Sequence, residues 1–332
     1  MNQNDAHKYR LALVALTLSI LAYAGVPLLV RWCETDVSPE AALFNRLWIA
    51  AFVLLCWKIG QNINRVRVIR FSVNSDLPVT QQAKGLLPSF NIDRKSFFLL
   101  MIVATSFVAN VWALYWGMRK TSIVNSSLIH NLTPLFATFG GWLLFKTQFS
   151  HRFILGTAIA TIGAIVLGFN DFQFDSTKIQ GDAVALCSAL FLTINLLSIE
   201  CLRGQFSTSF ILLLECAIGL FLSGLLTLMW HEPLFPATVQ GWLSVIGLAI
   251  LGHLMGGGLQ TYALSYLSAG FVALMCLLDP MLTGIAAWFA FGETLSLANV
   301  LAFVIILLGT CLAISVGTTK QVEADAGLKL ER

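Results

Sequence analysis

The chain has 332 residues, of which 57% are hydrophobic and only 11% are charged, and its formal net charge is +3. Soluble domains usually carry about 25% charged residues, so this composition excludes a water-soluble globular protein of this size. Together with a mean hydropathy of +0.80, it predicts an integral membrane protein.

Ten stretches along the chain are apolar enough to cross a bilayer as helices, which takes about 20 residues each. They are expected at 11–31, 40–59, 97–117, 122–145, 152–169, 181–200, 208–230, 240–261, 267–291 and 296–316. The first follows Lys8 and Arg10, as a signal peptide would, but it is too long for one and nine further stretches follow. The predicted fold class is therefore all-α integral membrane, with ten transmembrane helices.

Lysine and arginine predict the orientation, because cytoplasmic loops carry an excess of these residues. If the N-terminus is cytoplasmic and the loops alternate, 15 of the 20 basic residues lie on the cytoplasmic side. Four lie outside, and Arg46 falls within a span. We therefore expect a multi-pass protein of the cell inner (plasma) membrane with both termini in the cytoplasm.

A polar segment of about residues 60–96 separates the second span from the third. It contains Pro78 and Pro88 and is basic on balance. We interpret it as a long, flexible cytoplasmic loop that contacts the inner leaflet.

The chain contains an internal repeat. The run "NLTPLFATFGGW" aligns with "LLDPMLTGIAAW" at a shift of 146 residues, and the alignment continues through the next span without a gap. Pro134 then meets Pro280, and Trp142 meets Trp288. A shared proline and tryptophan in fixed register favour duplication over the chance similarity of apolar sequences.

The earlier spans align less closely, at a shift of 169 that places Arg46 over Glu215. Each half then carries five spans, and because five is odd, the second half crosses the membrane in the opposite sense. We predict two inverted five-helix repeats: residues 1–170 with the long loop, and residues 171–332 with a cytoplasmic tail. Such repeats recur in secondary transporters, whose halves meet near the midplane of the bilayer.

On these features the chain resembles the drug/metabolite transporter (DMT) superfamily, in its EamA-type ten-helix branch. The resemblance is carried by the five-plus-five spans, the proline in the fourth span of each half, and the runs "SPEAALFNR" and "GETLS". It covers roughly residues 10–316. Two positions depart from the pattern: Asp279 precedes Pro280 where the family commonly shows Glu, and Thr147 replaces the first-half counterpart of the acid in "GETLS".

Polar residues of the fourth span share one helical face. Those that recur at helical spacing are Ser122, Ser126, His130 and Thr133. Asn131 flanks them, and Pro134 removes a backbone hydrogen bond and leaves a carbonyl available. We interpret the group as the lining of a wet cavity, with Pro134 and Pro280 as the two helix breaks. The alternative is a set of hydrogen bonds between helices.

Spans three, eight and nine add further candidates for substrate binding. Those expected to line the same cavity are Asn110, Tyr115, His253, Gln260 and Asp279. Tyr115 has an alternative role, because aromatic residues near span ends commonly form an interface belt. The glycines at 256–258 accompany no P-loop lysine, so they indicate close helix packing rather than a phosphate site.

Arg46 and Glu215 form a candidate gating or charge pair. A lone charge near the midplane is costly, and opposite charges at equivalent positions of the two halves could offset that cost. The alternative is that each lies close enough to the end of its span to reach the headgroups.

No catalytic or metal-binding constellation is present in the sequence. The seven cysteines are scattered singly without metal-ligand spacing, and neither HExxH, GxSxG nor a Walker A motif occurs. We therefore predict no enzyme activity, no metal site and no cofactor, and the resemblance likewise implies no bound cofactor.

We interpret the chain as a secondary transporter that works by alternating access between its two halves. The resemblance implies export of small organic metabolites such as amino acids or related compounds. If transport is coupled to protons, Asp279, Glu215, His130 or His253 would carry them. The expected partners are the small-molecule substrate, the lipid bilayer and no nucleic acid, with the protein as a monomer or a homodimer.

Two other classes remain open. A transporter of nucleotide-sugars or phosphorylated sugars should present several cations to the phosphates, but only Arg46 lies well within a span. An intramembrane enzyme or receptor would need a clustered reactive set, which the sequence does not offer.

Overall fold

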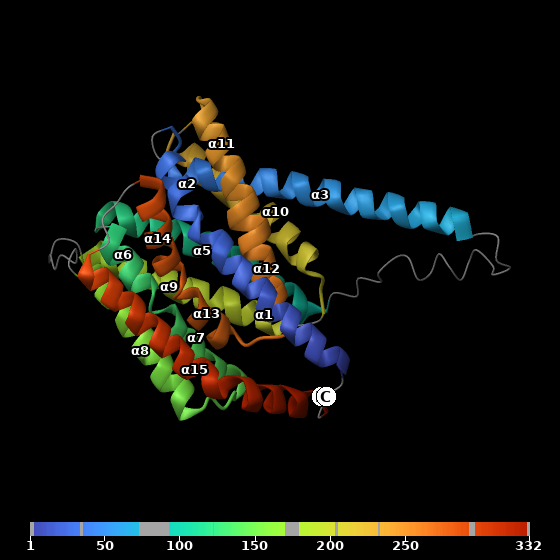
Figure 1. The fold of residues 1–332 in the computed structure, drawn as a ribbon. Coiled ribbons are helices and arrows are strands. Elements are labelled where there is room, and N and C mark those ends of the chain that lie inside the picture. The colour runs from blue at the N-terminus through green and yellow to red at the C-terminus, as the bar shows by residue number, and fades with distance from the viewer. Residues whose placement is uncertain are drawn as a thin grey trace.

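The computed structural model of the protein describes residues 3–33, 36–72, 93–121, 123–169, 179–202, 205–231, 233–291 and 296–330. Nearly all of these residues are helical, and no strand occurs among them. Figure 1 shows a bundle of slanted helices in which the start of α1 and the end of α15 lie at the same end.

Helices of the first half are α1 (Gln3–Ala24), α2 (Val26–Cys33), α3 (Pro39–Ser72), α5 (Arg94–Lys120), α6 (Ile123–His130), α7 (Thr133–Phe145) and α8 (His151–Phe169). Those of the second half are α9 (Ile179–Cys201), α10 (Thr208–Met229), α11 (Val239–Gly247), the π-helical segment η2 (Leu248–Gly257), α12 (Gly258–Leu264), α13 (Ala269–Cys276), α14 (Asp279–Phe291) and α15 (Leu297–Leu330). Nine stretches of the described chain are long and apolar enough to span a membrane, and the shorter helix His151–Val166 makes the tenth. The prediction of ten transmembrane helices is confirmed.

One segment differs from the expectation. The loop expected from residue 60 begins later, because α3 continues as helix to Ser72 and projects well beyond the bundle (Figure 1). Residues 61–72 contain neither glycine nor proline, so nothing in them ends the helix. Residues 73–92, with Pro78 and Pro88, and residues 292–295, most of the "GETLS" run, lie outside the described residues.

The internal repeat is visible in the ends of the helices. A shift of 146 residues carries α6 onto α13 and α7 onto α14 at both ends, and carries the start of α8 onto the start of α15. A shift of 169 carries the start of α3 onto the start of α10, and a shift of 145 carries the start of α5 onto that of α11. The duplicated sequence therefore folds into duplicated elements.

Helix packing obeys the same symmetry. Three pairs join equivalent spans of the two halves: the second and seventh (α3 with α10), the fourth and ninth (α7 with α13), and the fifth and tenth (α8 with α15). The close packing of α5 on α9 has its counterpart in the packing of η2 and α12 on α1. Two five-helix repeats that cross the membrane in opposite senses account for this pattern, and the predicted inverted-repeat fold is confirmed.

The α8–α15 interface depends on glycines. A Cβ atom at Gly163 would lie 2.8 Å from the backbone nitrogen of Ile306, which is closer than real Cβ atoms come. A Cβ atom at the equivalent residue, Gly309, would lie even closer to the backbone nitrogen of Ala160. The shift of 146 residues turns one contact into the other, because Gly163 corresponds to Gly309 and Ala160 to Ile306. The backbones of α8 and α15 therefore approach each other at equivalent glycines.

The fourth span is interrupted at residues 131–132, just before Thr133 and Pro134, and the backbone carbonyl that Pro134 leaves without a helical partner is hydrogen-bonded locally. Proline has no N–H, so the His130 carbonyl four residues earlier loses its helical partner. The hydroxyl of Thr133 donates a hydrogen bond of 2.6 Å to that oxygen. The His130 carbonyl, which the sequence predicted to be available, therefore accepts a hydrogen bond. Pro280 follows the first residue of α14 in the same way, but Asp279 stands at the position of Thr133.

Candidate functional site

The π-helical segment η2 lies at the centre of span eight and lets large polar side chains approach its backbone. A Cβ at Gly252 would lie 3.0 Å from the guanidinium carbon of Arg46, and one at Gly256 would lie 2.8 Å from the ring of Tyr23. Ser19 of α1 donates a hydrogen bond of 2.7 Å to the Gly256 carbonyl. π-Helical turns often occur at functional sites, and these glycines provide the close packing that the sequence predicted.

Arg46 points into the bundle rather than out to the headgroups. Its side chain is only 7% exposed, it lies against the middle of span eight, and its guanidinium carbon is 5.9 Å from the centre of the Phe107 ring. Its Nε atom is buried and has no hydrogen-bond partner among the described residues. A buried cation with an unpaired donor is available to a ligand that carries an acceptor.

His253 lies beside Arg46 in the same interior region. The His253 ring meets Phe107 edge-on at 5.3 Å, and its Nε2 lies 3.3 Å from Sγ of Cys216 in α10. The side chain is 1% exposed, so it is enclosed by protein in this conformation. Arg46 and His253, which the sequence places in different halves, therefore share one site.

Glu215 is held by a hydrogen bond from α9. Nδ2 of Asn195 donates to Oε1 of Glu215 at 3.3 Å and to the Val103 carbonyl of α5 at 2.8 Å. Arg46 acts on Glu215 through space, as a coulombic partner. The equivalent charges are thus brought into one region, and Asn195 anchors the carboxylate at the junction of three helices.

A second polar group lies around the end of α1. The Tyr23 hydroxyl donates to Oε1 of Gln260 at 3.5 Å, and Nε2 of Gln260 donates to Sγ of Cys276 at 3.2 Å. Asp279 is an electrostatic neighbour of Tyr23 and Cys276, and its Oδ1 is buried without a hydrogen-bond partner among the described residues. Three predicted spans therefore converge here: one, eight and nine.

Tyr23 joins the two groups. Its electrostatic neighbours include Arg46 and Glu215 on one side and Cys276 and Asp279 on the other. Tyr23 and Asp279 lie deep in the bundle, yet each keeps part of its surface accessible. We name this set the central cluster; it comprises Tyr23, Arg46, Glu215, His253, Gln260, Cys276 and Asp279. It combines one cation, two carboxyl groups and several neutral donors and acceptors from both halves.

His130 has a different partner. Its Nδ1 lies 2.9 Å from the Ser188 hydroxyl of α9, and that hydroxyl donates to the Ala185 carbonyl at 2.7 Å. Because the Ser188 proton is used there, Nδ1 of His130 is the donor in their bond. His130 therefore links α6 to α9, which fits the alternative of a hydrogen bond between helices, and its side chain is partly buried.

The remaining candidates are distributed elsewhere. Asn110 of α5 is buried, and its Oδ1 has no hydrogen-bond partner within the described ranges. Tyr115 lines a cavity of only about 10 Å³ beside Glu40 and Trp112, near the start of α3. Asn131 lies half-buried in the break between α6 and α7.

Sequence reasoning missed Tyr23, Phe107 and Asn195. Tyr23 and Asn195 are polar residues within apolar spans, and that signal could have identified them. Phe107 has no distinguishing sequence signal, because its role depends on which helices face it.

Comparison with known proteins was consistent with this architecture. The EamA-like transporter family model matches the chain twice, over residues 10–169 and 179–315. An uncharacterized transporter of Archaeoglobus fulgidus is 31% identical over 75 residues, a segment that covers 23% of this chain and 28% of that protein. The matched segment therefore spans less than a third of that relative's length.

A solved crystal structure has the same fold. It superposes with a TM-score of 0.73 over 91% of this chain and 96% of its own, at 14% sequence identity. At that identity the likeness concerns the fold alone. The two family matches cover most of the chain, and the chain belongs to the EamA-like transporter family.

Proposed function

We propose that the protein is a secondary transporter that exports small organic metabolites, such as amino acids or related compounds, by alternating access. The observation that carries this proposal is the central cluster. It gathers polar and charged side chains of both inverted halves in the interior of the bundle. Such groups are costly in a membrane protein and are usually retained for a substrate or an ion.

The composition of the cluster fits a zwitterionic substrate. The Arg46 guanidinium would receive a carboxylate, and Glu215 or Asp279 would receive an ammonium group. Gln260, His253 and Tyr23 would supply neutral hydrogen bonds, and Asn110, Asn131, His130 and Tyr115 would act on the route to the cluster. Asp279, Glu215, His130 or His253 would bind the coupling proton if protons drive the transport.

Topology and domain division are part of this proposal. The excess of basic residues in alternate loops supports an inner-membrane protein with both termini in the cytoplasm. The two family matches support halves that correspond to residues 1–170 and 171–332. The contacts between equivalent spans, α3 with α10 and α7 with α13, are those across which the halves would rock.

A transporter of phosphorylated sugars is supported less well. Arg46 is the one buried cation among the described residues, and a phosphate group would call for several.

The test is uptake of labelled amino acids and a panel of small metabolites into liposomes that contain the purified protein, with and without an imposed pH gradient. Wild-type protein should move at least one compound, and the Arg46→Gln and Tyr23→Phe variants should reduce that rate. The matched control is Thr105→Val, because Thr105 of α5 is exposed and bonds only to its own helix. If wild-type liposomes take up no compound faster than protein-free liposomes, the proposal is wrong.

A further inference from the structure

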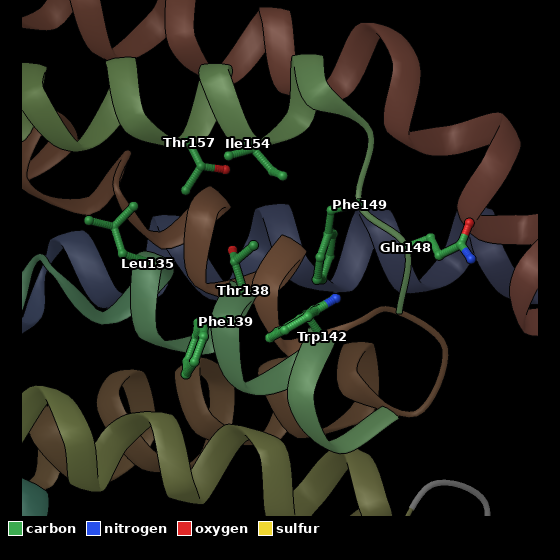
Figure 2. A pocket seen from close by; sticks show the side chains of 8 residues that line it. All are labelled: Leu135, Thr138, Phe139, Trp142, Gln148, Phe149, Ile154 and Thr157. Carbon is green, nitrogen blue, oxygen red and sulfur yellow. The ribbon is translucent and has the colours of Figure 1, made fainter. Parts of the chain in front are cut away.

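A cavity of about 530 Å³ opens between α7 and α8, away from the central cluster (Figure 2). Figure 2 shows Phe139 and Trp142 of α7 at one wall, Ile154 and Thr157 of α8 opposite, and Phe149 of the connecting segment between them. The volume is in the range of sites that hold small molecules.

This cavity is open to the lipid-facing surface. The side chains of Phe139, Trp142 and Ile154 are 59%, 56% and 50% exposed. In a chain that spans a membrane, such large apolar surfaces on transmembrane helices face hydrocarbon. The molecules that meet the opening are therefore lipids.

The inner wall of the cavity is well packed. The Phe149 ring lies 3.4 Å from the position of a Cβ at Gly141 of α7 and 3.2 Å from that of a Cβ at Gly270 of α13. It also stacks on Phe153 of α8, with ring centres 4.9 Å apart. Phe149 thus packs between α7 and α8 and separates these two helices beside the cavity.

The fold does not require this space, because the second half fills it. Under the shift of 146, Thr138 and Thr157 correspond to Gly284 and Phe303. The Phe303 ring reaches 3.2 Å from the position of a Cβ at Gly284. In the second half, the Phe303 ring therefore fills space beside Gly284. In the first half, the equivalent residues Thr157 and Thr138 leave space open.

Basic residues flank, along the chain, the segments that line the open cavity. Lys146 ends α7, and His151 and Arg152 begin α8; all three are exposed. The residues at the equivalent positions 292, 297 and 298 are Gly, Leu and Ala. The connection between α7 and α8 therefore carries basic residues, and the sequence of the equivalent connection in the second half does not.

We propose that the cavity between α7 and α8 binds an acyl chain of an anionic phospholipid whose headgroup is held by Lys146 and Arg152. Basic residues at the end of an intramembrane groove attract anionic headgroups, and the groove accepts the chain. In the orientation given under Proposed function, on which the choice of leaflet rests, this is a lipid of the inner leaflet. The bound chain supports α7, the helix that begins at the Pro134 break.

The test is native mass spectrometry of the whole protein released from nanodiscs that contain phosphatidylglycerol and phosphatidylethanolamine in equal amounts. Wild-type protein should retain phosphatidylglycerol preferentially. Thr157→Phe, which copies Phe303, should lose the bound lipid, whereas Thr105→Phe, which adds the same volume to an exposed position of α5, should keep it.

A second pair of variants tests the headgroup contact. Lys146→Gln and Arg152→Gln should each weaken the preference for phosphatidylglycerol roughly fivefold, because one basic residue near the membrane surface contributes about 1 kcal/mol to the binding of anionic lipid. The control variant Lys120→Gln, at the end of α5, should leave this preference unchanged. Undiminished lipid retention in Thr157→Phe, or equal retention of both lipids by wild type, would overturn the proposal. Neither readout depends on transport, so failure here leaves the transporter proposal standing.

Discussion

Asp36 accepts two hydrogen bonds from Thr238, a residue of the other half of the chain. Oδ2 of Asp36 lies 3.0 Å from the Thr238 backbone nitrogen and 2.9 Å from its hydroxyl. The hydroxyl oxygen of Thr238 also accepts a bond of 3.0 Å from the Gly241 N–H and so caps α11. The contact ties the connection before α3 to the start of α11 and holds the halves together at this end of the bundle.

An equivalent contact closes the opposite end. Asp93 corresponds to Thr238 and caps α5 by accepting a bond of 3.3 Å from the Ser96 N–H. The Ser96 hydroxyl donates to Oε1 of Gln205 at 2.9 Å, and Gln205 corresponds to Asp36. Inverted repeats thus place the same kind of contact at both ends.

We expect the Asp36–Thr238 contact to open in acid. The hydrogen bonds from Thr238, first from its backbone N–H, lower the pKa of the Asp36 carboxyl below its usual value of about 4. A carboxyl with a lowered pKa contributes its stabilisation above its usual pKa and loses it as the pH falls through the lowered value. Hydrogen exchange of the Thr238 amide, corrected for intrinsic rate, should rise in that range.

The Asp36→Asn variant separates this effect from general acid unfolding. It should raise exchange at Thr238 already at neutral pH and remove the acid dependence, whereas Asp93→Asn should leave Thr238 protected. Full protection of Thr238 in the Asp36→Asn variant at neutral pH would show that the carboxylate does not hold the contact.

Replacement of Asp279 by Asn should impair transport without harming the fold. Oδ1 of Asp279 has no hydrogen-bond partner among the described residues, and an unsatisfied buried polar group costs about 1–3 kcal/mol. The isosteric amide should therefore leave the melting temperature unchanged or raise it. Uptake of a transported compound should fall at least about tenfold, the equivalent of one lost interaction of about 1.4 kcal/mol.

Asp182→Asn is the matched control for that change. Asp182 also has a buried Oδ1 without a partner in the described part of the chain, but it lies in the first turn of α9, outside the central cluster. Equal loss of uptake in both variants would argue against a special role for Asp279.

Glycines at the α8–α15 interface should be intolerant of side chains. The Gly309→Ala variant places a Cβ 2.7 Å from the Gly156 carbonyl oxygen, which a helix backbone cannot easily vacate. We expect a loss of about 1–3 kcal/mol, typical of overpacking, measured as a lower melting temperature in detergent. Gly60→Ala in α3 is the control, because a Cβ there meets nothing within 4 Å.

Cysteine labelling tests the orientation. In a variant without the seven native cysteines, Ala237→Cys should react with an impermeant maleimide added to intact cells. Gln148→Cys should react only after the cells are made permeable, because the excess of basic residues in its loop predicts a cytoplasmic location. Both positions are exposed in the structure. The reverse pattern would invert the topology.

Much of the fold followed from the sequence, because the bilayer imposes simple local rules. Span length and apolar content predicted the ten helices, and the structure places Pro134 and Pro280 one residue into α7 and α14, just after the breaks that precede these helices. The register of 146 residues between the halves could be read from shared prolines and tryptophans, and it holds for the helix ends.

The tertiary structure alone decided which polar residues meet. Tyr23 became the link between two groups only because Gly252 and Gly256 let Arg46 and Tyr23 lie against the backbone of η2. The hydrogen bond between His130 and Ser188 of α9 likewise depends on how α6 packs on α9. Hydropathy specifies which solvent a helix meets, whereas the partner of a buried side chain depends on how closely and at what rotation separate helices pack, and no local pattern encodes that.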